Sequence, residues 1–307
     1  MRQRKQFVDD PKQCQPACRK HTKGLFEGMA PLSERIAITV WNCKQNCLTT
    51  TYANTVTMKA IIPMVPSAKA IASHRPEEHM KEDIHNNKGN IENSVESFLL
   101  AALLECAGRD DFNFLNNSIT MKNAILYATN DLIAYMQKDP AAKSNATLLL
   151  STSTSYTAVL HYRLANFIEK YIESNHQPFV DPLLPAKISR REKILSGAEI
   201  HHKSRIGKRF VLDHGYGTVI GETSAIGEDC YFLGGITLGA RGVSGNPDLP
   251  RHPVIGNRVQ IGAHTSIFGR IEIGNDVFIG PNCVITQDIP SNSIVRLRSS
   301  IQITSSK

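Results

Sequence analysis

The 307-residue sequence has no long hydrophobic run. A membrane-spanning helix needs about 18 consecutive apolar residues, and the longest apolar stretch here, around Phe98 to Leu104, is short and is followed by Glu105. The N-terminus lacks the apolar core of a secretory signal. We therefore expect no membrane association and a cytoplasmic location.

The sequence also gives no indication of a disulfide framework. The sequence has seven cysteines, an odd number without a secretory signal, which indicates free thiols in a reducing compartment. Two C-x3-C pairs, Cys14/Cys18 and Cys43/Cys47, have loose zinc-ligand spacing, and no ββα pattern surrounds them. We expect no metal.

The net charge of +7 is concentrated at one end of the chain. Residues 1–24 carry seven Lys/Arg against two Asp, which accounts for +5 of it. This tail has no interleaved aromatic residues and no nucleic-acid-binding motif, so we interpret it as a solvated tail and expect no nucleic-acid partner. A transit peptide stays open, although Asp9 and Asp10 argue against one.

The N-terminal two thirds divide into an extension and a helical region. Residues 1–90 predict a basic, partly disordered extension and linker, with an exposed loop over 73–90. Apolar residues spaced by three and four predict helices over 91–106, 119–136 and 155–173, the second stopping at Asp139-Pro140. These helices define an α-helical domain over 91–185.

From residue 186 to 290 the period changes to six. Aliphatic residues recur at this spacing, most clearly at Ile255, Ile261, Ile267, Ile273, Ile279 and Ile285. Neither a helix nor an isolated strand has this period, whereas a parallel β-helix does. Three sides give about 18 residues per coil, which places Ile261 next to Ile279 across one β-spacing. Residues 291–307 follow as a tail.

Two interruptions break the repeat, and loops of repeat proteins often carry function. Leu212 to Ile220 is eight residues rather than six, and the segment from Ala240 to Pro253 is an excursion. The first contains Asp213-His214, followed by Gly221-Glu222-Thr223; Glu199-Ile200-His201 lies upstream, and the excursion ends Arg251-His252-Pro253.

Over roughly residues 91–290 these segments resemble serine O-acetyltransferase, a hexapeptide-repeat acyltransferase. The resemblance implies an α+β chain with an N-terminal α-helical domain and a left-handed β-helix, although parallel crossovers are normally right-handed. It also implies acetyl transfer from acetyl-CoA to the hydroxyl of L-serine, giving O-acetylserine for cysteine biosynthesis.

Acetyl transfer to an alcohol needs a general base, for which histidine is suited. His214 is the candidate base, and its second ring nitrogen needs a carboxylate partner. Glu199 precedes it by 15 residues, just under one coil, so we expect Glu199 to orient His214.

The resemblance assigns the remaining site residues. Asp139 and Asp213 are expected to bind the ammonium of the amino acid, and Arg251 its carboxylate. His252 is expected beside the hydroxyl and the thioester, with Glu222 supporting the loop. Acetyl-CoA is expected to lie between coils, near Gly239, Ala240, Arg241, Ala263 and Pro281.

The chain departs from the family pattern at several positions. His202 replaces a proline, so His201 and His202 are interpreted as structural residues. The excursion begins Ala240-Arg241 and is about three residues longer than usual, so another hydroxy or amino acid stays open as the acceptor. Family members dock into the cysteine-synthesis sulfhydrylase through a C-terminal isoleucine; this sequence ends in Lys307, and we expect no such complex or a weak one.

Two other classes of protein stay open. A carbonic-anhydrase-like β-helix needs three convergent histidines for zinc, and a non-catalytic binding scaffold needs no thioester chemistry. The family further implies a homotrimer or a dimer of trimers, and feedback inhibition by cysteine.

Overall fold

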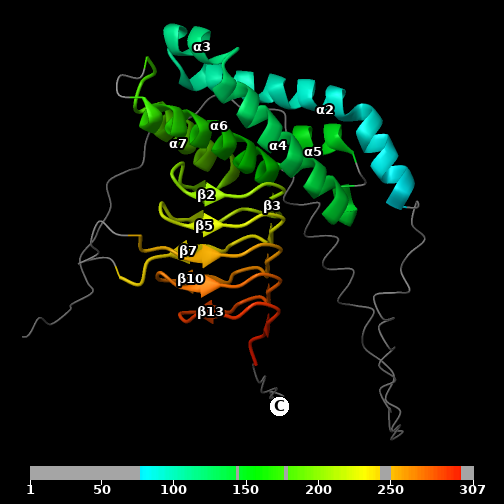
Figure 1. Ribbon diagram of the computed structural model, residues 1–307, viewed down its shortest axis with the longest axis vertical. Coiled ribbons are helices and arrows are strands. Elements are labelled where there is room, and N and C mark those ends of the chain that lie inside the picture. Colours follow the sequence, from blue (N-terminus) through cyan, green and yellow to red (C-terminus); the bar gives the residue numbers. More distant parts are fainter. Residues whose placement is uncertain (1–76, 143–144, 176–178, 243–249, 299–307) are drawn as a thin grey trace, which may run out of the picture. The chain divides into compact units, whose positions relative to one another are not determined.

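The computed structural model describes residues 77–142, 145–175, 179–242 and 250–298 (Figure 1). All described residues belong to one unit of the chain, Ala72–Lys307. The predictions for the basic tail, the two C-x3-C pairs and the last residues of the chain therefore lie outside the described part. None of the described helices is long and apolar enough to cross a membrane.

Helices form the first half of the described chain. They are α2 (Glu77–Cys106), α3 (Arg109–Leu115), α4 (Ile119–Lys138), α5 (Ala146–Thr152), α6 (Thr154–Ser174) and α7 (Leu184–Ser196), with a 3-10 turn at Pro140–Ala142. The three predicted helices are present within α2, α4 and α6. Serine side chains cap two of them: Ser118 accepts from the N–H of Met121 at the start of α4, and Ser153 accepts from that of Tyr156 at the start of α6.

The helix boundaries correct two sequence predictions. Helix α2 begins at Glu77, inside the segment predicted as an exposed loop, because residues 77–90 contain no proline to stop a helix. Helix α7 crosses the expected domain boundary at 185/186 and ends at Gly197, whose φ of 72° is the left-handed conformation typical of a helix C-terminus. The β-helix therefore begins at Glu199.

The second half is the expected left-handed β-helix, built from strands of two or three residues. They are β1 (Glu199–Ile200), β2 (Arg205–Ile206), β3 (Val211–Leu212), β4 (Val219–Ile220), β5 (Ala225–Ile226), β6 (Tyr231–Phe232), β7 (Thr237–Gly239), β8 (Val254–Ile255), β9 (Gln260–Ile261), β10 (Ser266–Phe268), β11 (Glu272–Ile273), β12 (Phe278–Ile279), β13 (Val284–Ile285) and β14 (Ile294–Val295). Strand β14 lies in the segment predicted as a tail.

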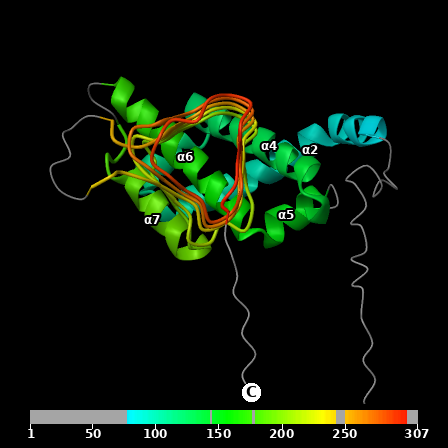
Figure 2. The same cartoon turned by 90° about the horizontal axis from the view of Figure 1, so that it is seen from below.

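The strands form three parallel sheets, and the coils superpose as a triangle when viewed from below (Figure 2). Sheet 1 has the order β1-β4-β7-β10-β13, sheet 2 has β2-β5-β8-β11, and sheet 3 has β3-β6-β9-β12-β14. Ile261 pairs with Ile279, which confirms the predicted register of 18 residues. The inward aliphatic side chains of successive coils stack into one buried core.

The interruptions lengthen two of the coils. Glu199 pairs with Val219, twenty residues later, because the first interruption inserts two residues at a corner. Thr237 pairs with Ser266, because the excursion adds eleven more residues to the ordinary coil. All three sheets continue past both insertions, so the insertions change the corners and leave the stack of coils intact.

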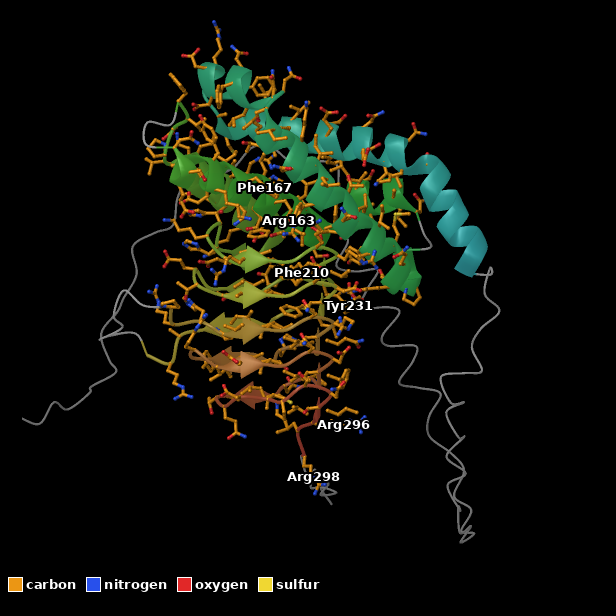
Figure 3. The ribbon with its side chains drawn as sticks, in the orientation of Figure 1. Arg163, Phe167, Phe210, Tyr231, Arg296 and Arg298 are labelled. Carbon is orange, nitrogen blue, oxygen red and sulfur yellow. The ribbon has the colours of Figure 1, made fainter. Side chains whose placement is uncertain are left out.

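A buried ion pair joins the helices to the first coil. Arg163 lies on α6, next to the first coils (Figure 3). Its guanidinium donates to both carboxylate oxygens of Asp131 on α4, at 2.7 and 3.1 Å, and to the carbonyls of Ile206 and Gly207. Asp131 also accepts from the backbone N–H of Phe210 at 2.9 Å. Since both charged side chains are fully buried, these hydrogen bonds fix the helical part on the β-helix.

Candidate active site

The two interruptions lie at different corners of the triangular coil. The His214 corner joins sheet 3 to sheet 1 through residues 213–218, 233–236, 262–265 and 280–283. The His252 corner joins sheet 1 to sheet 2 through residues 201–204, 221–224, 240–242, 250–253 and 269–271. One side of the triangle separates them; its six residues span at most about 20 Å.

The candidate base projects from the His214 corner. The His214 backbone has φ 55°, a left-handed conformation that the two inserted residues impose on this turn. Its side chain is 81% exposed, and Nε2 lies 3.6 Å from Oδ1 of Asp213. Gly234 on the next coil makes room, since a Cβ there would lie 2.2 Å from the His214 carbonyl oxygen. The imidazole is therefore open to a ligand.

Asp213, the neighbour of His214, is held by two phenols. Its Oδ1 accepts from the Tyr135 hydroxyl on α4 at 3.1 Å, and its Oδ2 accepts from the Tyr231 hydroxyl on β6 at 2.9 Å. The Tyr135 hydroxyl also lies 3.2 Å from Oγ of Ser155 on α6. The Asp213 carboxylate thus accepts from α4 and from β6, and α6 contributes through the Tyr135 hydroxyl. Neither tyrosine was predicted to have a role.

Asp139, the other carboxylate predicted to bind the ammonium, influences Tyr231. It ends helix α4, and its Oδ1 accepts from the N–H of Ala141 at 2.8 Å. Burial, the hydrogen bond to Asp213 and the charge of Asp139 together raise the pKa of Tyr231 well above its usual value. The charges of the two carboxylates predicted to bind an ammonium thus both act on Tyr231.

Glu199 does not pair with His214 in this chain. Its side chain is 48% exposed and forms an ion pair with Lys193 of α7. Because the first coil has twenty residues, Glu199 is in register with Val219 rather than with His214. The orientation of His214 by Glu199 therefore stays a prediction, since the carboxylate is directed to Lys193 in this structure.

Hydrogen bonds to Thr223, on the preceding coil, hold the end of the excursion in place. The Thr223 hydroxyl accepts from the backbone N–H groups of Arg251 and His252, at 2.9 and 3.2 Å. The Thr223 N–H donates to Nδ1 of His252 at 3.1 Å, and the Thr223 hydroxyl lies 2.8 Å from the same nitrogen. With two donors directed at it, Nδ1 acts as an acceptor, so the neutral ring carries its proton on Nε2.

Burial and the charge of Arg251 lower the pKa of His252, which favours this neutral form. Arg251 itself lies 3.3 Å from Glu222. Arg270 donates to the carbonyls of Thr223 and His252, at 3.4 and 3.2 Å. On this loop, Arg251 thus supplies a cation and the neutral ring of His252 supplies an N–H donor.

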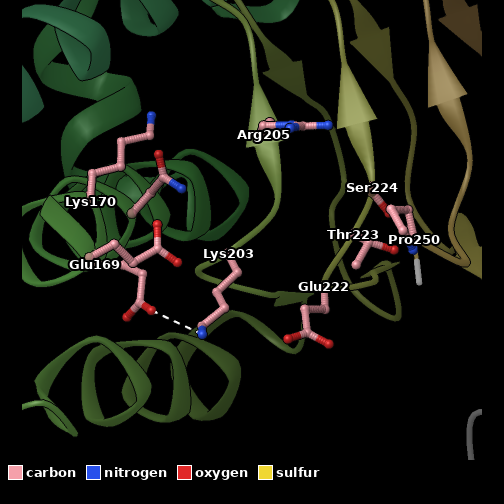
Figure 4. A pocket seen from close by; sticks show the side chains of 10 residues that line it. Glu169, Lys170, Lys203, Arg205, Glu222, Thr223, Ser224 and Pro250 are labelled. Carbon is pink, nitrogen blue, oxygen red and sulfur yellow. Dashed lines mark ion pairs between the residues drawn. The ribbon is translucent and has the colours of Figure 1, made fainter. Parts of the chain in front are cut away.

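A pocket opens beside this corner, between α6 and sheet 2 (Figure 4). It is lined by Asn166, Glu169, Lys170, Glu173, Lys203, Arg205, Glu222, Thr223, Ser224 and Pro250. Glu169 and Lys203 form an ion pair at 3.2 Å across it. The rings of His201 and His202, which precede Lys203 in the chain, stack with their centroids 4.5 Å apart.

The five residues predicted to contact acetyl-CoA divide between the two corners. Gly239 ends β7 and leads through Ala240 to Arg241, at the His252 corner, whereas Ala263 and Pro281 belong to the His214 corner. The Arg241 side chain donates to the carbonyl of Thr286. The single chain therefore does not bring all five together.

Metal ligands and disulfides are not found in the part of the chain that the structure describes. No group of three or more His, Cys, Asp or Glu side chains is arranged there to hold a metal. The described cysteines, Cys106, Cys230 and Cys283, are free thiols, and Cys230 and Cys283 are buried in the β-helix.

Comparison with known proteins identifies the family. Residues 252–287 match the model described as bacterial transferase hexapeptide (six repeats). The Helicobacter pylori serine acetyltransferase is 38% identical over 158 residues, covering 52% of this chain and 85% of that relative. The Synechococcus elongatus serine acetyltransferase is 34% identical over 165 residues, covering 54% of this chain and 63% of the relative.

Solved structures agree with the sequence relatives. The Entamoeba histolytica serine acetyltransferase isoform 3, in complex with cysteine, aligns over 71% of this chain and 84% of its own with TM-score 0.54 and 26% identity. The Neisseria gonorrhoeae serine acetyltransferase aligns over 70% and 81% with TM-score 0.54 and 27% identity. The chain therefore belongs to the serine acetyltransferase family of hexapeptide-repeat transferases.

Proposed function

We propose that this chain transfers the acetyl group of acetyl-CoA to the hydroxyl of L-serine, with His214 as the general base. The observation that supports this most directly is the exposed imidazole of His214 beside the doubly hydrogen-bonded carboxylate of Asp213. A base with an open ring nitrogen, next to a fixed anion that attracts an ammonium, suits a hydroxy amino acid.

The acceptor is bound at both of its charged groups. Asp213 and Asp139 attract its ammonium, and Arg251 binds its carboxylate through a guanidinium that Glu222 orients. His214 removes the proton of the hydroxyl as its oxygen attacks the thioester carbonyl. The C–S bond then breaks, and the thiolate of coenzyme A leaves.

His252 contributes a hydrogen-bond donor. Its Nε2–H is suited to the oxygen that gains negative charge as the thioester carbonyl is attacked. Because Thr223 occupies Nδ1, the ring cannot turn without losing two hydrogen bonds. Such a donor is already oriented before the reaction begins.

Glu199 is proposed to orient His214 in the working enzyme. Its ion pair with Lys193 is half exposed on both sides, and exposed pairs contribute little to stability. The carboxylate can therefore leave Lys193 at small cost and accept from the second ring nitrogen of His214.

The complete site is proposed to form between copies of the chain. His214 and Asp213 lie at the His214 corner, and the charge of Asp139 acts on Tyr231 next to them, while Arg251, Glu222 and His252 lie at the other corner. A closed ring of three copies puts the His252 corner of one subunit against the His214 corner of the next. The same ring places Gly239, Ala240 and Arg241 of one subunit next to Ala263 and Pro281 of its neighbour, so that all five can contact one acetyl-CoA.

A thiol-release assay tests the proposal. The full chain is mixed with acetyl-CoA and a panel of acceptors: L-serine, L-homoserine, L-threonine and 3-hydroxypropanoate, and the acetylated product is identified by mass spectrometry. We expect release of coenzyme A that depends on L-serine and gives O-acetylserine. Selective release with another acceptor would support the alternative that the altered Ala240-Arg241 loop leaves open.

A further inference from the structure

Two tyrosines outside the family motifs carry a role that the repeat does not reveal. We infer that Tyr135 and Tyr231 are positioning residues: they hold the Asp213 carboxylate in one orientation and so set the affinity of the site for an acceptor with a primary ammonium group. This inference rests on the proposed function, because it takes Asp213 as the ammonium ligand of the acceptor.

The hydrogen-bond directions follow from the number of protons. Each phenol has one proton, and Asp213 as an anion only accepts, so both hydroxyls donate to it. The Tyr135 oxygen is then free to accept from the Ser155 hydroxyl at 3.2 Å, and the Ser155 oxygen lies 3.1 Å from that of Ser153. The network thus leads from α6 through α4 to the carboxylate.

Neutral donors orient the carboxylate without cancelling its charge. A lysine or arginine in their place would pair with Asp213 and compete with the ammonium of the acceptor. Burial, more than any other effect, raises the pKa of Tyr135 to about 12 and also raises that of Tyr231, so both phenols keep their protons near neutral pH. A carboxylate has about four acceptor positions, so two remain for the ligand.

The C-terminal end of α4 contacts the β-helix through Tyr135 and Lys138. Tyr135 lies one helical turn before Asp139, the residue that ends α4. Lys138, which directly precedes Asp139, forms an ion pair with Asp229 at 2.8 Å. The Lys138 ammonium also donates to the Asp229 carbonyl at 2.7 Å. Helix α4 therefore carries one carboxylate of the ammonium site and one of the donors that orient the other.

The first test compares hydroxyl deletions in the full chain. Tyr135→Phe and Tyr231→Phe each remove one donor to a charged group and keep the ring. We expect the KM for L-serine to rise about tenfold in each, since each variant loses a hydrogen bond to the charged group that binds the ammonium. The KM for acetyl-CoA should stay unchanged, and kcat should change much less than the KM for L-serine.

Tyr156→Phe is the matched control. Its hydroxyl donates to the carbonyl of Ala128 at 3.0 Å inside the same helical part, so this variant loses a buried hydrogen bond without touching Asp213. We expect a lower unfolding midpoint and unchanged kinetic constants. Equal increases in the KM for L-serine in all three variants would overturn the inference, because the effect would then be structural.

A double-mutant cycle separates positioning from general damage. L-serine binding, measured by equilibrium dialysis without acetyl-CoA, is compared for wild type, Tyr231→Phe, Asp213→Asn and the double variant. We expect Tyr231→Phe to weaken binding about tenfold in the wild-type background and less than about twofold beside Asp213→Asn. Additive effects would refute the inference. If wild type acetylates none of the acceptors, the proposed function fails instead, whereas an active wild type with unaltered tyrosine variants refutes only the positioning role.

Discussion

The imidazole of His252 lies directly over the α-carbon of Gly221: a Cβ built on that glycine would lie 2.2 Å from both Cδ2 and Nε2 of the ring. Gly221→Ala should therefore displace His252 and lower kcat about a hundredfold, as loss of a preorganised donor does. The matched control is Gly89→Ala, since nothing lies within 4 Å of a Cβ at that position on α2. Wild-type turnover by Gly221→Ala, with its fold intact, would remove His252 from the mechanism.

His214 should be tested with asparagine rather than alanine. Its φ of 55° strains most side chains, but asparagine tolerates the left-handed conformation while lacking a basic nitrogen. We expect His214→Asn to lower kcat by about 10²–10⁴-fold with little change in the unfolding midpoint. Asp276→Asn, at φ 58° on the corner between sheets 2 and 3, is the control for asparagine in this conformation and should keep full activity.

A shared active site predicts complementation between inactive variants. His214→Asn removes the base from one corner, and Arg251→Ala removes the cation from the other. Co-refolding equal amounts of the two should restore about a quarter of the sites in a closed ring, because one interface combination in four has both intact corners. If the mixture stays as inactive as its components while forming the ring, each site lies within one chain.

The buried pair between Asp131 and Arg163 should dominate the stability of the junction. Asp131→Asn leaves the guanidinium buried without its counter-charge, and we expect a loss of about 3–5 kcal/mol in the free energy of unfolding. The double variant Asp131→Leu/Arg163→Met should recover much of this loss, because it leaves no unpaired charge. Chemical denaturation measures both; a recovery no better than the single variant would argue against a penalty from unpaired charge.

An exposed ion pair provides the comparison. Arg258 contacts both carboxylate oxygens of Asp276 at 2.7 Å, on a corner open to solvent. Because water screens such pairs, Arg258→Ala should leave the denaturation midpoint almost unchanged. The difference between the stability losses of Arg258→Ala and Asp131→Asn then measures how much burial adds to the cost of breaking an ion pair.

The buried Glu192 on α7 should make stability depend on pH. Burial, opposed by hydrogen bonds from Ser196 and the N–H of Ile200, raises the pKa of Glu192 from 4.5 to about 8. Between pH 4.5 and 8 the native state therefore keeps a proton on Glu192 that the unfolded state has lost. The free energy of unfolding is highest below pH 4.5 and falls as the pH rises towards 8, by up to about 1.4 kcal/mol per pH unit.

Glu192→Gln tests this dependence, because it keeps the shape of the side chain and cannot ionise. Denaturation midpoints from pH 5 to 8 should fall in wild type and stay flatter in the variant. The neighbouring charges of Lys193 and Glu199 are present in both proteins, so their effect cancels in the comparison. Equal slopes in the two proteins would contradict the raised pKa.

Local periodicity was sufficient to predict much of the architecture. The six-residue spacing specified the coil and its register, and the three- and four-residue spacing predicted the helices within α2, α4 and α6. Both patterns depend on which side chains face the core, and such patterns can be read along the chain. Short helices such as α3 and α5, with seven residues each, are too brief to show a period.

The site was only partly predictable for a related reason. The interruptions indicated candidate loops, and Asp213 of the first one lies beside His214, while the charge of Asp139 acts on Tyr231. The tyrosines themselves were missed, because a phenol on α4 and one on the following coil reach Asp213 only after the helices dock. The ion pair of Glu199 with Lys193 was likewise missed, because the two side chains meet only once α7 packs beside the first coil.

The sequence by itself determined the β-helix, its family and the two loops that interrupt it, because each follows from residues close together in the chain. Tertiary structure alone decided which groups meet: the phenols on Asp213, the Thr223 backbone N–H that sets the His252 tautomer, and the separation of the two corners. Those contacts depend on how distant segments pack, and packing geometry is not encoded in any local period.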